Sequence, residues 1–150
     1  LVCVERLRRY FPGCALTADM ITGFPGETEA DQAAAVAFLE QVGFAAVHVF
    51  PYSRRPGTKA DAMPEQLSHA VKSARAHEAQ RVADACKQRY LVQQVGQTLP
   101  VLFETEHDGS WVGHSDNYCL VRAVGDDLRG LVKNVKISAV SGQMLVGDLV

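Results

Sequence analysis

Apolar residues recur at three- and four-residue steps in three stretches of the chain, which is the spacing of helices that bury one face. The first stretch covers residues 1–11 and stops at a Pro-Gly pair. The second covers residues 28–43; Thr28, with an acid three positions on, can cap its start, and Gly43 can end it. The third runs from residue 65 to about residue 95, with an apolar side formed by Leu67, Val71, Ala74, Val82 and Ala85.

Two short apolar stretches lie between these predicted helices. Residues 14–22 are bounded by turn residues and predict a buried strand, and residues 44–51 have the length and β-branched content of a second strand. Helix and strand alternate over the first fifty residues, which is typical of a parallel sheet built from βα units and covered on both faces. The loop at residues 52–64 is long, and ligands bind in such loops at the carboxyl ends of parallel strands.

The pattern changes after Gly96, where short β-rich runs replace the helices. Turn signals such as Asp108-Gly109 and Ser141-Gly142 separate the runs. The runs cover residues 99–104, 118–124, 131–140 and 143–150. This spacing predicts a small closed β-barrel. The sequence thus predicts two domains, an α/β domain at residues 1–95 and an all-β domain at residues 96–150.

Composition excludes several classes of protein. Hydrophobic residues make up 47% and charged residues 21% of the 150 residues, as in a soluble globular chain rather than a collagen, a coiled coil or a disordered tail. The net charge is −2, so any contact with nucleic acid must come from a local patch. No apolar run approaches the roughly 20 residues that cross a bilayer, and we expect a cytoplasmic protein without membrane contact. Because the chain opens inside a helical pattern without Met, we expect it to be cut from a longer protein.

The four cysteines are widely separated, at Cys3, Cys14, Cys86 and Cys119. None has the close pairing of a zinc ribbon or a cluster motif. We therefore predict reduced, buried cysteines and no metal site. Trp111 is predicted to pack in the barrel, and His69 and His77 are predicted to face solvent.

Two glycine-containing loops could carry chemistry. In DMITGFPGET, residues 19–28, a strand turns through two glycines into a helix, which lets the backbone approach a ligand near the positive end of the helix dipole. A tight turn with no ligand fits this loop equally well. In HVFPYSRRPGT, residues 48–58, arginines can bind carboxylate or phosphate and Tyr52 can stack, although a solvated surface turn is the alternative. Because both loops follow adjacent parallel strands, we expect them to open at the same end of the sheet.

Together the two loops resemble the methylthiotransferase family of radical S-adenosylmethionine enzymes. The resemblance implies that residues 1–95 end a partial TIM-type (βα)6 barrel and that residues 96–150 form a TRAM domain, an OB-like RNA-binding module. The second loop, with Lys72 and Arg75, is most similar to the branch that methylthiolates threonylcarbamoyladenosine beside the tRNA anticodon. The branch acting on isopentenyladenosine is the alternative, and the branch modifying a ribosomal-protein aspartate is more distant.

This family implies a four-iron four-sulfur (4Fe-4S) cluster that cleaves S-adenosylmethionine, a radical that abstracts hydrogen from the target carbon, and a second cluster for sulfur delivery. The C-x3-C-x2-C cysteines of the radical cluster are absent here, so we expect its ligands outside the chain, no catalytic residue within it, and no activity of the chain alone. The missing N-terminal half and the anticodon stem-loop of tRNA are the implied partners. The implied cofactor-binding residues are Ile21, Gly23, Phe24, Pro25, Gly26, Glu27, Tyr52, Ser53 and Thr58.

RNA contact requires cationic and stacking side chains on one face. The candidates are Arg75, Tyr118, Arg122, Lys133 and Lys136. Residues 96–150 hold four cations and seven acids, which is unfavourable for a free-standing RNA binder, so we expect weak tRNA orientation by this domain. A barrel that only covers the enzyme, a non-catalytic interaction module, and a different S-adenosylmethionine or nucleotide enzyme with the same turn are the remaining alternatives.

Overall fold

The computed structural model describes all residues, 1–150, and they form two compact units. The first unit comprises Leu1–Pro12 and Leu16–Lys87, and the second comprises Gly13–Ala15 and Gln88–Val150. The division thus falls within the long helix, and the assignment of domains to residues 1–95 and 96–150 stays a prediction. No helix of the chain has both the length and the apolar character needed to span a bilayer.

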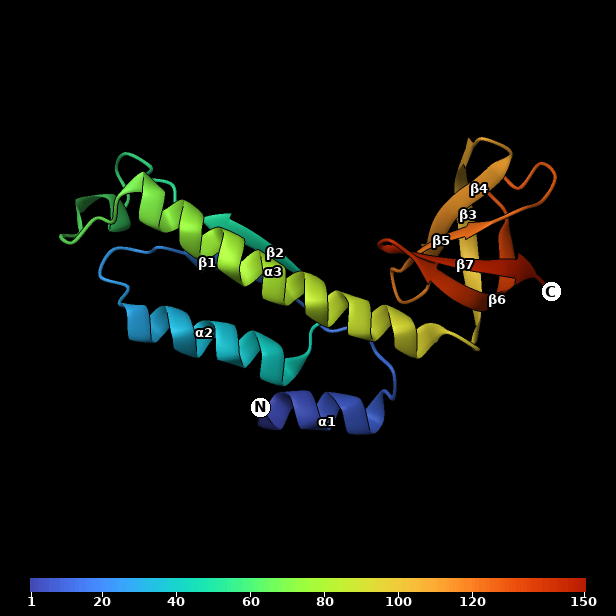
Figure 1. The fold of residues 1–150 in the computed structure, drawn as a ribbon, viewed down its shortest axis with the longest axis horizontal. Helices are drawn as coiled ribbons and strands as arrows, with labels where there is room; N and C mark the ends of the chain where they lie inside the picture. Colours follow the sequence, from blue (N-terminus) through green and yellow to red (C-terminus); the bar gives the residue numbers. More distant parts are fainter. The chain divides into compact units, whose positions relative to one another are not determined.

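The first unit is built from helices and two parallel strands (Figure 1). Its elements are α1 (Val2–Tyr10), β1 (Thr17–Thr22), α2 (Glu29–Val42), β2 (Ala46–Pro51), the short 3₁₀ helix η1 (Ala60–Ala62) and α3 (His69–Gln94), which continues into the second unit. β1 and β2 pair in parallel, from Thr17 opposite Ala46 to Thr22 opposite Pro51. The predicted order of helix and strand is confirmed.

Both predicted ends of α2 are confirmed. The Thr28 hydroxyl accepts the Asp31 N–H at 3.1 Å, and the Asp31 carboxylate accepts the Thr28 N–H at 2.9 Å, which is a capping box. The hydrogen bonds from the Thr28 side chain and backbone lower the pKa of Asp31. Gly43 ends the helix in the left-handed conformation, with φ of 61°.

The core of the first unit lies on one side of the two-stranded sheet. Leu39 of α2, Val47 of β2 and the small residues Ala79 and Ala83 of α3 form it, and Met20 of β1 packs against it. The prediction that both strands are buried is wrong for the opposite face, where Ile21 is 56% and Phe50 is 51% exposed. The physical reason is that this chain supplies only two strands and covers only one of their faces.

The predicted limits and buried face of α3 need correction. The helix begins at His69 rather than at residue 65, because Glu65 has a left-handed φ of 60° that interrupts a helix. The predicted face is wrong at Ala74 and Ala85, which are exposed. The residues of α3 that are buried instead are Lys72, Arg75, Ala76, Ala79, Ala83, Cys86, Tyr90, Leu91 and Gln94.

The second unit contains the predicted small β-barrel, which is closed and five-stranded (Figure 1). Its strands are β3 (Thr98–His107), β4 (Ser110–Ser115), β5 (Leu120–Ala123), β6 (Val132–Ser141) and β7 (Met144–Leu149), in the order β3-β4-β5-β7-β6. β3 pairs with β6 and thereby closes the barrel. Strand β4 was not among the four predicted runs. Fully buried core residues include Val101, Phe103, Val121, Val135 and Leu145.

Two glycines allow this small barrel to close. A Cβ on Gly113 would lie 2.0 Å from the Leu102 carbonyl oxygen, and one on Gly147 would lie 2.2 Å from the Lys136 carbonyl oxygen. Each glycine pairs with a strand beside a β-bulge, where the bulged strand bends and comes close.

The side-chain predictions outside the loops hold in part. Trp111 is buried, and His69 and His77 are exposed, as predicted. Cys86 and Cys119 are buried as predicted. The prediction of a buried cysteine is wrong for Cys3, which is exposed on α1, a helix without buried residues, and it holds only in part for Cys14, which is half-buried.

Candidate functional site

The two glycine-containing loops, residues 19–28 and 48–58, each bend directly after a strand, and these two bends lie side by side, as predicted. Thr22 and Pro51 are opposite each other at the ends of β1 and β2, and the Tyr52 N–H donates to the Thr22 carbonyl at 2.8 Å. The rings of Phe24 and Tyr52, one from each bend, meet edge to face with centroids 5.2 Å apart. The bends therefore share one edge of the sheet.

A cleft of ≈ 510 Å³ opens at this edge. Its walls are mostly apolar and aromatic, with three hydroxyl-bearing side chains and one guanidinium. The lining residues are Ile21, Phe24, Phe50, Pro51, Tyr52, Ser53, Arg55, Thr58 and Ala60. A cleft of this size and lining is typical of a small-molecule site.

The structure brings five of the nine candidate cofactor residues to the cleft: Ile21, Phe24, Tyr52, Ser53 and Thr58. The other four, Gly23, Pro25, Gly26 and Glu27, do not line it. Gly23 and Pro25 are buried instead. A cofactor contact of any of the nine remains a prediction.

The residues that do not line the cleft build the turn beside it. Gly23, with φ of 72°, donates its N–H to both carboxylate oxygens of Glu27, at 2.9 and 3.0 Å. Gly26, with φ of 80°, donates its N–H to the Glu65 carbonyl at 3.2 Å. The glycines thus supply the positive φ values that the turn requires.

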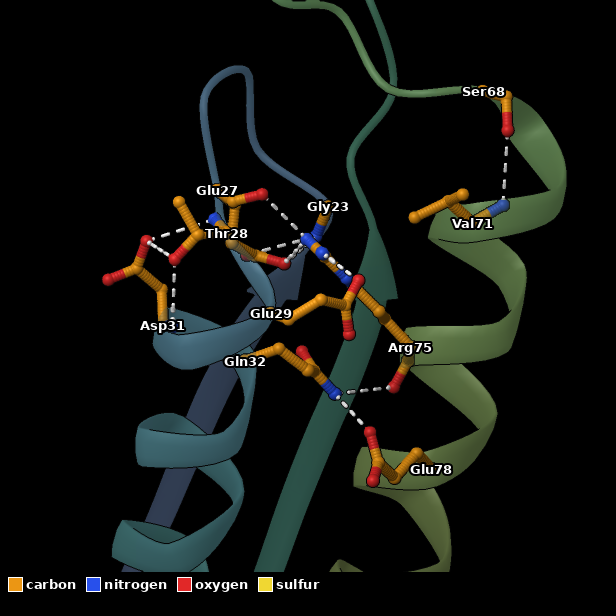
Figure 2. A network of polar contacts seen from close by, with 10 residues as sticks. All are labelled: Gly23, Glu27, Thr28, Glu29, Asp31, Gln32, Ser68, Val71, Arg75 and Glu78. Carbon is orange, nitrogen blue, oxygen red and sulfur yellow. Dashed lines mark hydrogen bonds and ion pairs between the residues drawn. The ribbon is translucent and has the colours of Figure 1, made fainter.

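Arg75 of α3 holds the same turn from the helix side (Figure 2). One guanidinium nitrogen donates to the Glu27 carboxylate at 2.6 Å and to the Glu27 carbonyl at 2.9 Å, and the other donates to the Glu29 carboxylate at 2.7 Å. The hydrogen bonds with Glu29 and Glu27 raise the pKa of Arg75, while burial opposes this shift. Arg75 is only 6% exposed, and an RNA contact would have to break these ion pairs. We therefore do not retain Arg75 among the RNA-binding candidates.

Lys72 lies one helical turn before Arg75 and is also buried. Its ammonium nitrogen lies 4.9 Å from the centroid of the Tyr52 ring, a cation–π contact. Its aliphatic stem fills the space beside Gly23, where a Cβ would come 2.6 Å from Lys72 Cγ. The packing role of Lys72 and Arg75 was not predicted from the sequence. Their spacing of three, which places them on one helix face, is the signal that could have revealed it.

The loop after β2 is fixed by its own hydrogen bonds. Arg54 donates to the Asp61 carboxylate at 2.8 Å and to the Asp61 carbonyl at 3.0 Å. The Thr58 hydroxyl donates to the Arg55 carbonyl at 2.8 Å and accepts the Asp61 N–H at 3.2 Å. The Thr58 hydroxyl is therefore engaged within the loop, although Thr58 lines the cleft.

The remaining RNA-binding candidates are spread over the barrel. Lys133 and Lys136 are exposed on β6, while Arg122 is half-buried on β5, and β7 lies between these strands. The Lys136 ammonium donates to the Gly96 carbonyl at 2.5 Å. Tyr118, in the β4–β5 loop, is 85% exposed. The structure does not gather these side chains on one strand, and their RNA contact stays a prediction.

Comparison with known proteins places the chain in a family. No protein-family model matches it. The threonylcarbamoyladenosine tRNA methylthiotransferase of Bacillus subtilis is 36% identical over 140 residues, covering 89% of this chain and 31% of that protein. The tRNA-2-methylthio-N(6)-dimethylallyladenosine synthase of Maricaulis maris is 40% identical over 149 residues, covering 97% of this chain and 33% of that protein. The chain belongs to the methylthiotransferase family. The synthase of the same name from Nitratidesulfovibrio vulgaris is 35% identical over 154 residues, covering 97% of this chain and 34% of that protein.

Membership of the methylthiotransferase family confirms the resemblance seen in the two loops. Relatives of both tRNA branches match, so these matches do not select a substrate. The chain spans about a third of the length of these curated relatives.

Proposed function

We propose that this chain is part of a tRNA methylthiotransferase that modifies threonylcarbamoyladenosine next to the anticodon by radical S-adenosylmethionine chemistry. In this proposal the first unit contributes two strands to a partial radical S-adenosylmethionine barrel, and the second unit is a TRAM domain. The cleft between the two bends is the observation that carries the proposal, because it joins the two loop motifs into one concave site.

The cleft residues fit S-adenosylmethionine. The aromatic rings of Phe24 and Tyr52 offer an apolar surface against which an adenine can pack, and Ser53 adds a polar group to the cleft wall. Bound there, the cofactor supplies the methyl group and the radical chemistry. The chain's own residues bind and orient it, and the Arg75 and Lys72 contacts hold the two bends around it.

The residues of this chain do not fit an iron–sulfur cluster. No three His, Cys, Asp or Glu side chains gather where they could hold a metal. We therefore propose that the cluster ligands lie in a part of the protein outside this chain.

In the second unit, we propose that Tyr118, Arg122, Lys133 and Lys136 contact tRNA weakly. The exposure of Tyr118 and of the two β6 lysines supports this role, since stacking and phosphate contacts require accessible groups. Phosphate contacts make the affinity fall steeply with salt.

A second candidate substrate is isopentenyladenosine in tRNA. The match to the Maricaulis maris synthase, whose name gives the dimethylallyl (isopentenyl) derivative, keeps this substrate as a candidate, whereas the residues of the second loop favour threonylcarbamoyladenosine.

Mass spectrometry of tRNA nucleosides tests the proposal. A strain lacking the full-length gene is complemented with the wild-type gene, with a cleft-filling Ile21→Trp variant, or with Val92→Trp as a matched control on exposed α3 surface. We expect the methylthio derivative of threonylcarbamoyladenosine with the wild type and with Val92→Trp, and its loss with Ile21→Trp. Restoration of methylthio-isopentenyladenosine would select the second candidate, and no methylthio nucleoside with the wild type would refute both.

A further inference from the structure

Two adjacent arginines in the loop after β2 have different surroundings. Arg54 is committed to the loop, since its guanidinium is paired with the carboxylate and the carbonyl of Asp61. Arg55 is exposed and is the only charged residue among those lining the cleft. The sequence alone gives the two arginines equal standing, and the structure separates them.

The backbone of Arg55 is held in place while its side chain is available. Its carbonyl accepts the Thr58 N–H at 3.2 Å and the Thr58 hydroxyl at 2.8 Å, which closes a turn through Gly57. The φ of 82° at Gly57 is one that this turn requires and that glycine adopts at no steric cost. The turn thus places a guanidinium at a wall otherwise built from apolar and hydroxyl groups.

We infer that Arg55 binds the carboxylate of the ligand that occupies the cleft. A guanidinium presents planar paired donors that match the two oxygens of a carboxylate. A ligand that fills the cleft displaces water from its apolar walls, which lowers the local dielectric constant and strengthens this pairing. The inference deepens the proposed function and rests on it, since both molecules that the proposed reaction brings together carry one carboxylate: the methionine part of the cofactor and the threonine part of the nucleoside.

Paired ligands with and without the carboxylate test the inference in the reconstituted full-length protein. The cofactor pair is S-adenosylmethionine and its decarboxylated form. The nucleoside pair is an anticodon stem-loop carrying threonylcarbamoyladenosine and the same stem-loop with that carboxylate methylated. Affinities are measured for the wild type, for Arg55→Gln, and for Arg54→Gln as the matched neighbouring control.

We expect Arg55→Gln to weaken the carboxylate-bearing member of one pair roughly 10- to 100-fold, as for loss of a charged hydrogen bond, and to leave its carboxylate-free partner unchanged. The pair that responds identifies whether the cofactor or the nucleoside supplies the carboxylate. Arg54→Gln should leave all four affinities near those of the wild type. Arg55→Lys, which keeps the charge but loses the planar fork, should fall between the wild type and Arg55→Gln.

Two results would overturn the inference while sparing the proposed function. One is unchanged affinity of Arg55→Gln for all ligands, and the other is equal weakening of both members of a pair. If the wild-type protein binds neither S-adenosylmethionine nor the stem-loop, the proposed function fails and the inference falls with it.

Discussion

Removing the Arg75 guanidinium should loosen the turn that forms one side of the cleft. Arg75→Met retains the aliphatic bulk and deletes three hydrogen bonds. The bond to Glu29 is worth at most about 1 kcal/mol, because that carboxylate is 88% exposed. The Glu27 carboxylate is only 15% exposed, and breaking a buried ion pair costs about 3–5 kcal/mol. In the variant the Glu27 carboxylate still accepts the Gly23 N–H, so it is not left without a partner. We therefore expect the stability of the turn to fall by about 2–4 kcal/mol in total.

Native-state hydrogen exchange of the Gly23 amide measures this loss at the turn itself. A loss of about 2–4 kcal/mol corresponds to exchange roughly 30- to 700-fold faster in Arg75→Met. Arg81→Met is the matched control, because Arg81 is exposed on the same helix. The Glu27→Gln substitution combined with Arg75→Met should cost less than the sum of the two single changes, since both remove one ion pair. Equal exchange of the Gly23 amide in Arg75→Met and Arg81→Met would refute the conclusion that the Arg75 ion pairs stabilise the turn.

Three further changes test the backbone and the barrel. Gly23→Ala should destabilise the first unit in thermal unfolding by at least twice as much as Gly57→Ala. Both substitutions place alanine at a positive φ, which costs about 1–2 kcal/mol, but only the Cβ at position 23 also collides with Lys72. Gly113→Ala should cost about 3 kcal/mol or more in urea unfolding, because its Cβ meets backbone; a cost equal to that of Gly130→Ala, which faces open space, would contradict this. Burial raises the pKa of Tyr90 to about 12 from 10.0, so the folded state holds this proton more tightly and its stabilisation is lost as pH rises from 10 to 12. The free energy of unfolding should therefore fall more steeply over that range in the wild type than in Tyr90→Phe, and parallel pH profiles would refute it.

Local signals in the sequence predicted the elements that short-range physics determines. The capping residues Thr28 and Gly43 act on their own helix, so the ends of α2 were predictable. The strands before the two bends were predictable from their apolar runs, and parallel pairing then placed the bends together. The cleft therefore follows from local patterns plus one topological rule.

The face of α3 was not predictable from hydrophobicity. Within the first unit its buried side is mostly made of alanines, which pack closely because they are small, and of Lys72 and Arg75, whose partners lie far away in the sequence. A charged residue counts as polar in a periodicity analysis, and only the tertiary structure reveals the carboxylates and the ring that accept it. Because its partners cannot be seen in the sequence, Arg75 was predicted to be an RNA-binding residue.

The proposed function requires that the two bends form one cofactor site, and a structure of the full-length protein with bound S-adenosylmethionine would show whether they do. We expect the cofactor to contact Phe24 from the first bend and Tyr52 from the second, with Ile21 beneath it. A cofactor bound elsewhere, with this cleft filled by the protein's own side chains, would contradict it.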